Sequence, residues 1–174
     1  MEFAIGPCGP DQLGALLDIQ EEAFAALEDE SLLRRNTPEM LESCLLPPHV
    51  TLGAWQGNVL AAFSILYFPE EQEDLSLSLA EVDRMELKAA NYKLCIVRPA
   101  FRGNGLQYRL GLALERYAKE AGVGLLCATV SPHNGHSMEN IRKMGYTYNR
   151  TLIKYGLERA LYYKFLPGKI PEEG

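Results

Sequence analysis

The sequence predicts one α/β (α+β) domain, with a mixed, mostly antiparallel twisted sheet of about seven strands flanked by about four helices. Two observations carry this prediction. An apolar run at 92–97, an amphipathic segment at 106–121 and an apolar run at 124–130 follow one another, and this order makes a right-handed crossover between two parallel strands. Hairpin patterns at 50–68 and 146–166 lie on either side of the crossover and add antiparallel strands.

Composition limits the classes of protein that the chain can belong to. Its 174 residues are 47% hydrophobic and 23% charged, as in an ordinary globular domain. The net charge of −6 argues against nucleic acid or an anionic membrane as the main partner, because both favour a basic surface. Without an export signal or an apolar run of membrane-spanning length, we expect a soluble cytoplasmic protein. Four cysteines without paired spacing, and only His133 and His136 as clustered histidines, predict reduced thiols and no metal site.

The first half of the chain begins with a short strand at 3–5 that ends at glycine and proline turn signals. Apolar residues at helical spacing predict an amphipathic helix over 11–27, with Asp11 as its N-cap. A second, shorter helix begins at Thr37, which a proline follows. The hairpin then consists of strands at 50–55 and 59–68, and the second strand is apolar on both faces, which is typical of a central strand.

The stretch 69–88 shows neither helical nor strand periodicity. Acidic residues flank its leucines, and they include Glu81, Asp83 and Glu86 just before the next strand. Two interpretations stay open. The stretch is a solvated connection, as charge runs usually are, or some of its acids face a cationic substrate such as a polyamine or an aminoglycoside.

The loop after strand 92–97 has the features of an anion site. Pro99 cannot continue a central ladder, while Gly103 and Gly105 permit φ > 0 and let a ligand approach the backbone. A helix beginning near Gly105 directs its free N–H groups and its dipole at the loop, a site for phosphate to which Arg102 adds positive charge. The loop is neither a Walker loop nor a dinucleotide fingerprint, because no Gly-Lys-Ser/Thr follows and Tyr108 stands at the third glycine position.

The C-terminal part completes the domain. Gly122 ends the long helix, and strand 124–130 leads to a short helix that Ser137 caps and Gly145 stops. Strands at 146–155 and 157–166 pair around Gly156. The domain therefore spans 1–166, and 167–174 is a polar tail that we expect to be disordered.

Two motifs at a fixed separation then identify a family. The loop Arg102-Gly103-Asn104-Gly105-Leu106-Gln107 and a second set one crossover later resemble the signatures of the GNAT superfamily of acyl-CoA-dependent N-acyltransferases. The loop matches that family's arginine-or-glutamine, any two, glycine, any, glycine-or-alanine pattern except at Gln107. The order of elements over 1–166 also fits, and 154–159 is similar to the end of an uncharacterised bacterial subgroup. The second set consists of Asn134, Ser137, Lys143, Gly145 and Tyr146.

The resemblance implies acetyl-CoA as co-substrate, with the central parallel strands splayed to admit it. Backbone amides of Arg102, Gly103, Asn104, Gly105, Leu106 and Gln107 would hold the pyrophosphate. The pantetheine arm would lie along Ile96 and Val97, with Asn134 and Ser137 contacting it and Lys143 near a phosphate. From the residues alone, Asn134 and Ser137 are equally read as a helix cap, and Lys143 as part of a solvated helix face.

The implied reaction is direct attack of an amine on the thioester. An alkylamine, with a pKa near ~10.4, must lose a proton first, so a base is expected; Glu86, Asp83, Glu81 and also His133 are candidates. The tyrosine that many family members use as general acid falls at Ile141 here. Tyr146 or Tyr108 could replace it, although a thiol of pKa near ~8.5 also leaves without a dedicated acid.

Three functions follow as hypotheses. The first is an N-acetyltransferase acting on a primary amine of a small molecule or a protein. The second is a catalytically inactive acyl-CoA-binding sensor or interaction module on the same fold, which the isoleucine at 141 motivates. The third is a nucleotide-phosphate binder that uses the same loop. It ranks below the other two, because the loop lacks the lysine that binds phosphate in nucleotide-binding proteins. The oligomeric state stays open between a monomer and a homodimer.

Overall fold

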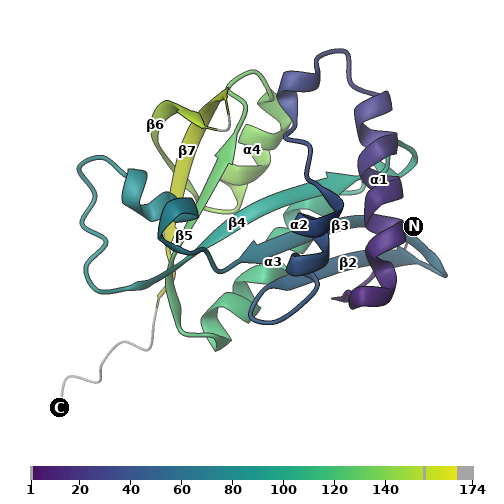
Figure 1. Cartoon of the computed structure of the whole chain (residues 1–174), viewed down its shortest axis with the longest axis horizontal. Coiled ribbons are helices and arrows are strands. Elements are labelled where there is room, and N and C mark those ends of the chain that lie inside the picture. Colours follow the sequence, from purple (N-terminus) through teal and green to yellow (C-terminus); the bar gives the residue numbers. More distant parts are fainter. Residues whose placement is uncertain (1, 155, 168–174) are drawn as a thin grey trace.

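The computed structural model describes residues 2–154 and 156–167, which form one mixed sheet flanked by helices (Figure 1). Seven strands lie in the order β1-β2-β3-β4-β5-β7-β6, and every neighbouring pair is antiparallel except β4 and β5. The predicted fold class is therefore confirmed. The strands are β1 Ala4–Pro7, β2 Val50–Gln56, β3 Val59–Tyr67, β4 Lys88–Val97, β5 Val123–Val130, β6 Thr147–Lys154 and β7 Leu157–Phe165.

Four α-helices cover the two faces of the sheet. The helices α1 (Leu13–Ala25) and α2 (Pro38–Cys44) pack on one face, and α3 (Leu106–Glu120) packs on the other. Helix α4 (Gly135–Lys143) lies beside α3 and adds to the same core. Short 3-10 segments complete the described elements: η1 Pro10–Gln12, η2 Glu30–Leu32, η3 Glu71–Glu73, η4 Leu75–Ser78 and η5 Pro99–Phe101.

Alternation along the strands produces the two cores. In β3, Phe63 and Ile65 face α1 and α2, while Ala62 and Leu66 face α3. All four side chains are fully buried, and burying a large aliphatic or aromatic side chain stabilises a fold by about 1.5–3 kcal/mol. The prediction of a central strand that is apolar on both faces is confirmed.

Some boundaries differ from those predicted. Strand β4 begins at Lys88, four residues earlier than the apolar run suggested, because Lys88–Asn91 pairs with β5 although it lacks an apolar pattern. The acidic stretch contains η3 and η4 and is otherwise irregular. Predictions for Tyr155 and for the tail beyond Pro167 lie outside the described residues.

The parallel pair β4–β5 separates partway along its length. Pairing runs from Lys88 with Val123 to Asn91 with Cys127, and then it stops. From Tyr92 to Val97, β4 pairs only with β3, on its other side, and a register shift opposite Ile65 and Leu66 marks a bulge near the same point. The β5 edge of β4 is therefore open towards its carboxyl end.

Candidate functional site

The loop between β4 and α3 is held from several sides. The Arg98 guanidinium donates from Nε to the Leu60 carbonyl at 2.6 Å and lies 2.8 Å from the Glu22 carboxylate on α1. Phe101 packs edge-on against Phe3, with ring centroids 5.9 Å apart. These contacts fix the start of the loop against the sheet and α1.

The two glycines of the loop adopt the backbone that the sequence predicted. Gly103 has φ +84° and Gly105, the N-cap of α3, has φ +67°, a region that other residues rarely enter. A Cβ on either glycine would meet no atom within 4 Å, so the space above both is open. No side chain caps the N-terminus of α3, which leaves its first N–H groups available to an anion.

A cavity of about 460 Å³, the wide cavity, lies against this loop. It brings together nearly all of the residues that the sequence assigned to coenzyme A. The assigned residues that line it are Ile96, Val97, Arg102, Gly103, Asn104, Gly105, Leu106, Gln107, Asn134 and Ser137. Lys143 does not line it, because its ammonium group lies on the exposed side of α4, 3.6 Å from Glu139.

Helix α4 closes one side of the wide cavity. Asn134 caps the helix, and its Oδ1 accepts from the Ser137 amide at 3.2 Å. The cap interpretation is therefore confirmed for Asn134, whereas Ser137, which was expected to cap this helix, lies in its first turn and supplies the amide that the cap binds. Both residues also line the cavity. One turn further, Asn140 Nδ2 donates to Gln107 Oε1 at 3.1 Å, which joins α4 to the loop helix. Sequence reasoning missed Asn140 and the neighbouring His136, for which the only signal was their spacing from Asn134 on one helix.

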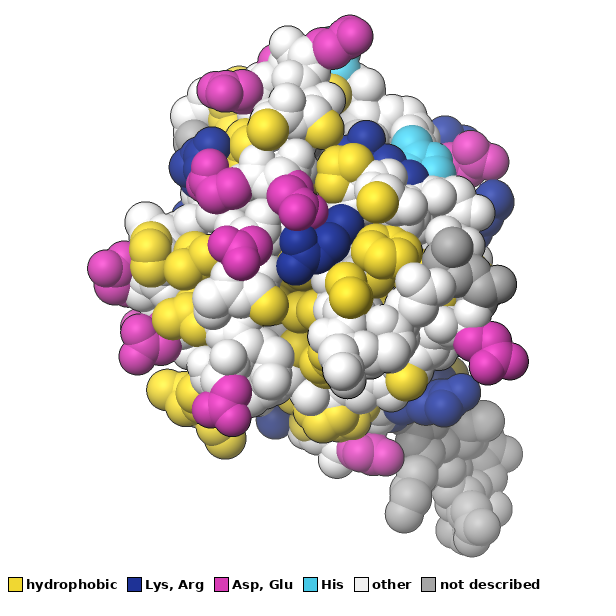
Figure 2. Space-filling view, turned by 90° about the vertical axis from the view of Figure 1, so that its right-hand side faces the viewer, with side chains coloured by type: hydrophobic (Ala, Val, Ile, Leu, Met, Phe, Trp, Pro, Cys, Tyr) yellow, Lys and Arg dark blue, Asp and Glu magenta, His cyan; other side chains and the backbone are white. Residues whose placement is uncertain are grey.

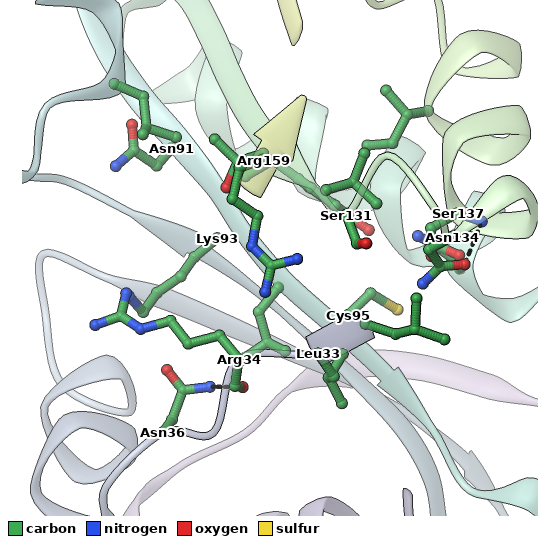
Figure 3. Close-up of a pocket in the computed structure, with 18 residues that line it drawn as sticks. Leu33, Arg34, Asn36, Asn91, Lys93, Cys95, Ser131, Asn134, Ser137 and Arg159 are labelled. Carbon is green, nitrogen blue, oxygen red and sulfur yellow. Dashed lines mark hydrogen bonds between the residues drawn. The ribbon is translucent and has the colours of Figure 1, made fainter. Parts of the chain in front are cut away.

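A second, smaller cavity of about 90 Å³, the narrow cavity, continues from the wide one (Figure 3). It lies where β4 and β5 separate, with Lys93 and Cys95 from one strand and Thr129 and Val130 from the other. The residues common to both cavities are Leu32, Leu33, Cys95, Gln107, Asn134 and Ser137.

The charged lining of the narrow cavity is entirely basic. Arg34, Lys93 and Arg159 line it, and the described residues contribute no aspartate, glutamate or histidine to its wall. Arg159 comes from β7, is only 4% exposed and donates from Nη1 to the Ser31 carbonyl at 3.3 Å. Burial, and then the charge of Arg34, lower the pKa of Lys93.

The proposed base residues lie elsewhere. Glu81, Asp83 and Glu86 are exposed in the connection from η4 to β4 and line neither cavity. Asp83 accepts from the Met85 amide at 2.8 Å, within its own turn. This arrangement favours the solvated-connection interpretation of the acidic stretch. His133 is also exposed and lines neither cavity.

The acid candidates are also outside the cavities. Tyr146 is buried in the core against α3 at 5% exposure, where burial raises the pKa of its hydroxyl well above the usual value. Tyr108 is 37% exposed on α3 and lines neither cavity. Ile141, at the position where the family often has its tyrosine, lines the narrow cavity with an apolar side chain.

The cysteine at the junction of the two cavities is unsuited to nucleophilic catalysis. Burial raises the pKa of the Cys95 thiol to about 12, so the thiolate is scarce at neutral pH. The four cysteines are free, as predicted. The described residues contain no group of three or more metal-ligating side chains, and none of their helices has the length and apolar character to cross a bilayer.

Comparison with solved structures shows the same fold in acetyltransferases. The ribosomal-protein-S18-alanine N-acetyltransferase from Escherichia coli is 17% identical with a TM-score of 0.72, and the match covers 97% of this chain and 98% of that one. An N-acetyltransferase from Staphylococcus aureus Mu50 is 16% identical with a TM-score of 0.73, covering 96% and 100%. The paia N-acetyltransferase from Thermoplasma acidophilum, in complex with coenzyme A, is 17% identical with a TM-score of 0.69, covering 95% and 100%. No curated protein sequence matches this chain.

The fold and the family profile together define the class of protein, an acyltransferase. The acetyltransferase (GNAT) family profile matches residues 13–146, which include the loop, the splayed strands and α4. The chain belongs to the GNAT acetyltransferase family.

Proposed function

We propose that the protein transfers an acetyl group from acetyl-CoA to a primary amine by direct attack. The observation that carries this proposal is the continuity of the site. An anion-binding loop at one end leads through the wide cavity into the gap between β4 and β5, where the narrow cavity begins. A long donor with a phosphate group at one end and a reactive thioester at the other fits this arrangement.

The loop residues would hold the phosphate end of the donor. Amides from Arg102 to Gln107 would donate to a pyrophosphate in the open space above Gly103 and Gly105, and the Arg102 guanidinium would add charge. Gln107 is compatible with this role, because its backbone amide donates and its side chain is bonded to Asn140. The open edge at Ile96 and Val97 offers strand-like hydrogen bonds to the pantetheine amides. We assign no direct contact to Lys143.

Bound acetyl-CoA would supply an acyl group that is already activated as a thioester. A backbone N–H on the open edge of β4 would donate to the carbonyl oxygen as it becomes an oxyanion. The basic lining disfavours the ammonium form of an amine and so lowers its pKa from about 10.4. Because no carboxylate or imidazole of the described residues lines the narrow cavity, the amine would lose its proton to water there.

The acceptor end is small. A cavity of about 90 Å³ admits the amine end of a small molecule, or a single side chain or terminus of a protein. We propose that a small molecule is the acceptor, acting in the cytoplasm without nucleic acid or membrane as partner. The E. coli structural neighbour is named for a ribosomal protein substrate, so a protein amine is the alternative to test.

The alternative function, an acyl-CoA-binding sensor, is tested by the same experiment. Ile141 fills the position where many family members carry an acid, and the narrow cavity has no acidic side chain among the described residues. These observations favour an acyl-CoA-binding sensor that has lost catalysis, if water and the basic lining do not suffice for proton transfer.

The test measures thiol release from acetyl-CoA with a panel of amines, together with the mass of the product and the dissociation constant of coenzyme A. An acetyltransferase gives saturable thiol release and an acetylated amine, with no acetylated enzyme intermediate. Binding of coenzyme A without turnover on any small-molecule or peptide amine supports the sensor. Stabilisation by ATP, but not by coenzyme A, would reject both and support a nucleotide-phosphate binder.

A further inference from the structure

The acceptor end of the site carries a charge pattern that acetyl transfer does not require. Arg34 lies between η2 and α2, Lys93 lies on β4 and Arg159 on β7, so cationic residues from three separate parts of the chain line the narrow cavity. In Figure 3, Arg159 projects into the middle of the drawn residues, with Lys93 and Arg34 on one side and Ser131 on the other. These residues lie up to 125 positions apart, so the cluster is a product of the fold.

The charge of these three residues is opposite in sign to the net charge of the whole chain, which is −6. On the face that Figure 2 shows, acidic side chains are scattered among basic and hydrophobic ones rather than gathered into one patch. The acidic residues 81, 83 and 86 are solvent-exposed and outside both cavities. A cationic acceptor would therefore leave a mixed surface and enter a basic cavity, which costs electrostatic energy.

An anionic group on the acceptor reverses the sign of that interaction. We propose that the acceptor is a small amino acid, whose carboxylate is held by Arg34, Lys93 and Arg159 while its amine faces the donor thioester. This inference rests on the proposed acetyl transfer and names its substrate class.

Burial and geometry support a carboxylate as the bound group. Arg159 is almost completely buried, and arginine holds carboxylates with a planar fork of N–H donors. Burial, and then the nearby charge of Arg34, lower the pKa of Lys93, and the positive charge of Arg34 acts on Lys93 as a like charge at this end of the site. A bound carboxylate would offset this repulsion between like charges. The small volume selects a compact anion over a polyanion.

The positions of the donor loop, the cavity junction and the three cations along the site also fit an amino acid acceptor. The donor phosphate end belongs at Gly103 and Gly105, the junction of the two cavities lies at Cys95, and the three cations lie beyond it. An amino acid bound by its carboxylate among the cations therefore presents its amine back towards the junction. The cations are separate from the donor loop, because none of them lines the wide cavity.

The experiment compares matched acceptors on the intact protein. Free amino acids of varied chain length are measured beside their carboxamides and the amines that lack the carboxyl group. Both the turnover and the calorimetric affinity for the coenzyme A complex are recorded, so that a binding readout is available without catalysis. We expect kcat/KM and affinity to favour the best free amino acid over its carboxamide by about 30-fold.

Two neighbouring arginines supply a matched pair of variants. Arg34→Gln removes a cation that lines the narrow cavity, whereas Arg35→Gln removes one that is paired with Glu21 and lines neither cavity. We expect Arg34→Gln to reduce the preference for the carboxylate about tenfold, through KM for the amino acid, while leaving the carboxamide and coenzyme A affinities unchanged. Arg35→Gln should leave the preference as it is. If Arg34 had only a structural role, Arg34→Gln would weaken the binding of the amino acid and of its carboxamide alike.

The outcomes separate the inference from the proposed function. Equal or better use of the carboxamide, or of the decarboxylated amine, overturns the inference while acetyl transfer stands. A carboxylate preference in binding, without turnover of any acceptor, upholds the anion site and overturns the proposed transferase. If no amino acid is bound or acetylated while another amine is, the inference is wrong. Lys93→Met gives an independent check and should likewise reduce the preference for the carboxylate.

Discussion

The wide and narrow cavities meet at Cys95, yet they are built in opposite ways. The wide cavity is lined by one continuous stretch of backbone around Gly103 and Gly105, residues 101–107, and by the open edge of β4. The narrow cavity has cationic residues from the connection between η2 and α2, from β4 and from β7, which meet only in the folded chain. A backbone site suits a donor shared by a whole family, since it tolerates changes of side chain, while a side-chain site can change with the acceptor.

The strongest test of this difference is Gly105→Val. A branched side chain at φ +67° is strained and projects into the space proposed for the pyrophosphate. We expect the dissociation constant of coenzyme A to rise about 100-fold, as measured by calorimetry. Gly57→Val is the control, because Gly57 has φ +59° in the β2–β3 turn, with open space around it and far from both cavities. Equal losses of coenzyme A affinity in the two variants would refute the placement of the loop.

The next effect concerns pH at the acceptor side. Burial and Arg34 lower the pKa of Lys93, so its ammonium group loses its proton at a lower pH than a free lysine does. Only the charged form attracts a carboxylate; therefore KM for an amino acid should rise with alkaline pH as Lys93 is neutralised. We expect Lys93→Met to raise that KM about tenfold near neutral pH and to remove the alkaline rise. Coenzyme A affinity should show neither change, and a parallel change would contradict the separation of the two cavities.

A smaller effect is expected where one residue serves both the helix and the site. Asn134→Ala removes the cap of α4 and should lower the free energy of unfolding by about 1 kcal/mol in denaturant titrations. Because Asn134 lines both cavities, we also expect about a fivefold loss of coenzyme A affinity. Thr37→Ala removes a comparable cap from α2, at a position that lines neither cavity. It should reduce stability without changing coenzyme A affinity; a loss of affinity there would make the Asn134 result uninformative about the site.

The smallest effect is expected from the acidic connection. The combined change Glu81→Gln, Asp83→Asn and Glu86→Gln should alter kcat/KM by less than about twofold, because these carboxylates line neither cavity. The check is the pH profile of the triple variant beside that of the unaltered protein. Loss of an acidic limb in the profile would restore a carboxylate as the general base.

The sequence predicted the donor side because its signal is local. Glycines at 103 and 105, a preceding strand and a following amphipathic helix define the backbone of the loop, and those residues are close in the chain. Most strands of the sheet could be predicted for a similar reason, since alternating apolar residues and turn residues mark β2, β3, β6 and β7 in the sequence. The early start of β4 was missed, because pairing with β5, rather than apolar residues, extends that strand to Lys88.

The acceptor side could not be predicted in the same way. Arg34, Lys93 and Arg159 each look like ordinary surface charges in the sequence, and only the fold brings them to one cavity. Glu86 was instead proposed as a base from its nearness to the strand along the chain. Nearness along the chain does not imply nearness in space here, since the connection that carries Glu86 is exposed.

The short pairing between β4 and β5 has a thermodynamic consequence. The strands β1–β4 and the strands β5–β7 form two half-sheets that are joined edge to edge between Lys88 and Asn91, and separate beyond it. A ligand in the gap that bonds to both edges would act as an additional strand and lock the halves together. Ligand binding then stabilises the folded state by RT ln(1 + [L]/Kd), about 2.7 kcal/mol at a concentration of about 100 Kd. The cellular supply of the donor would thereby govern the resistance of the protein to unfolding as well as its rate of catalysis.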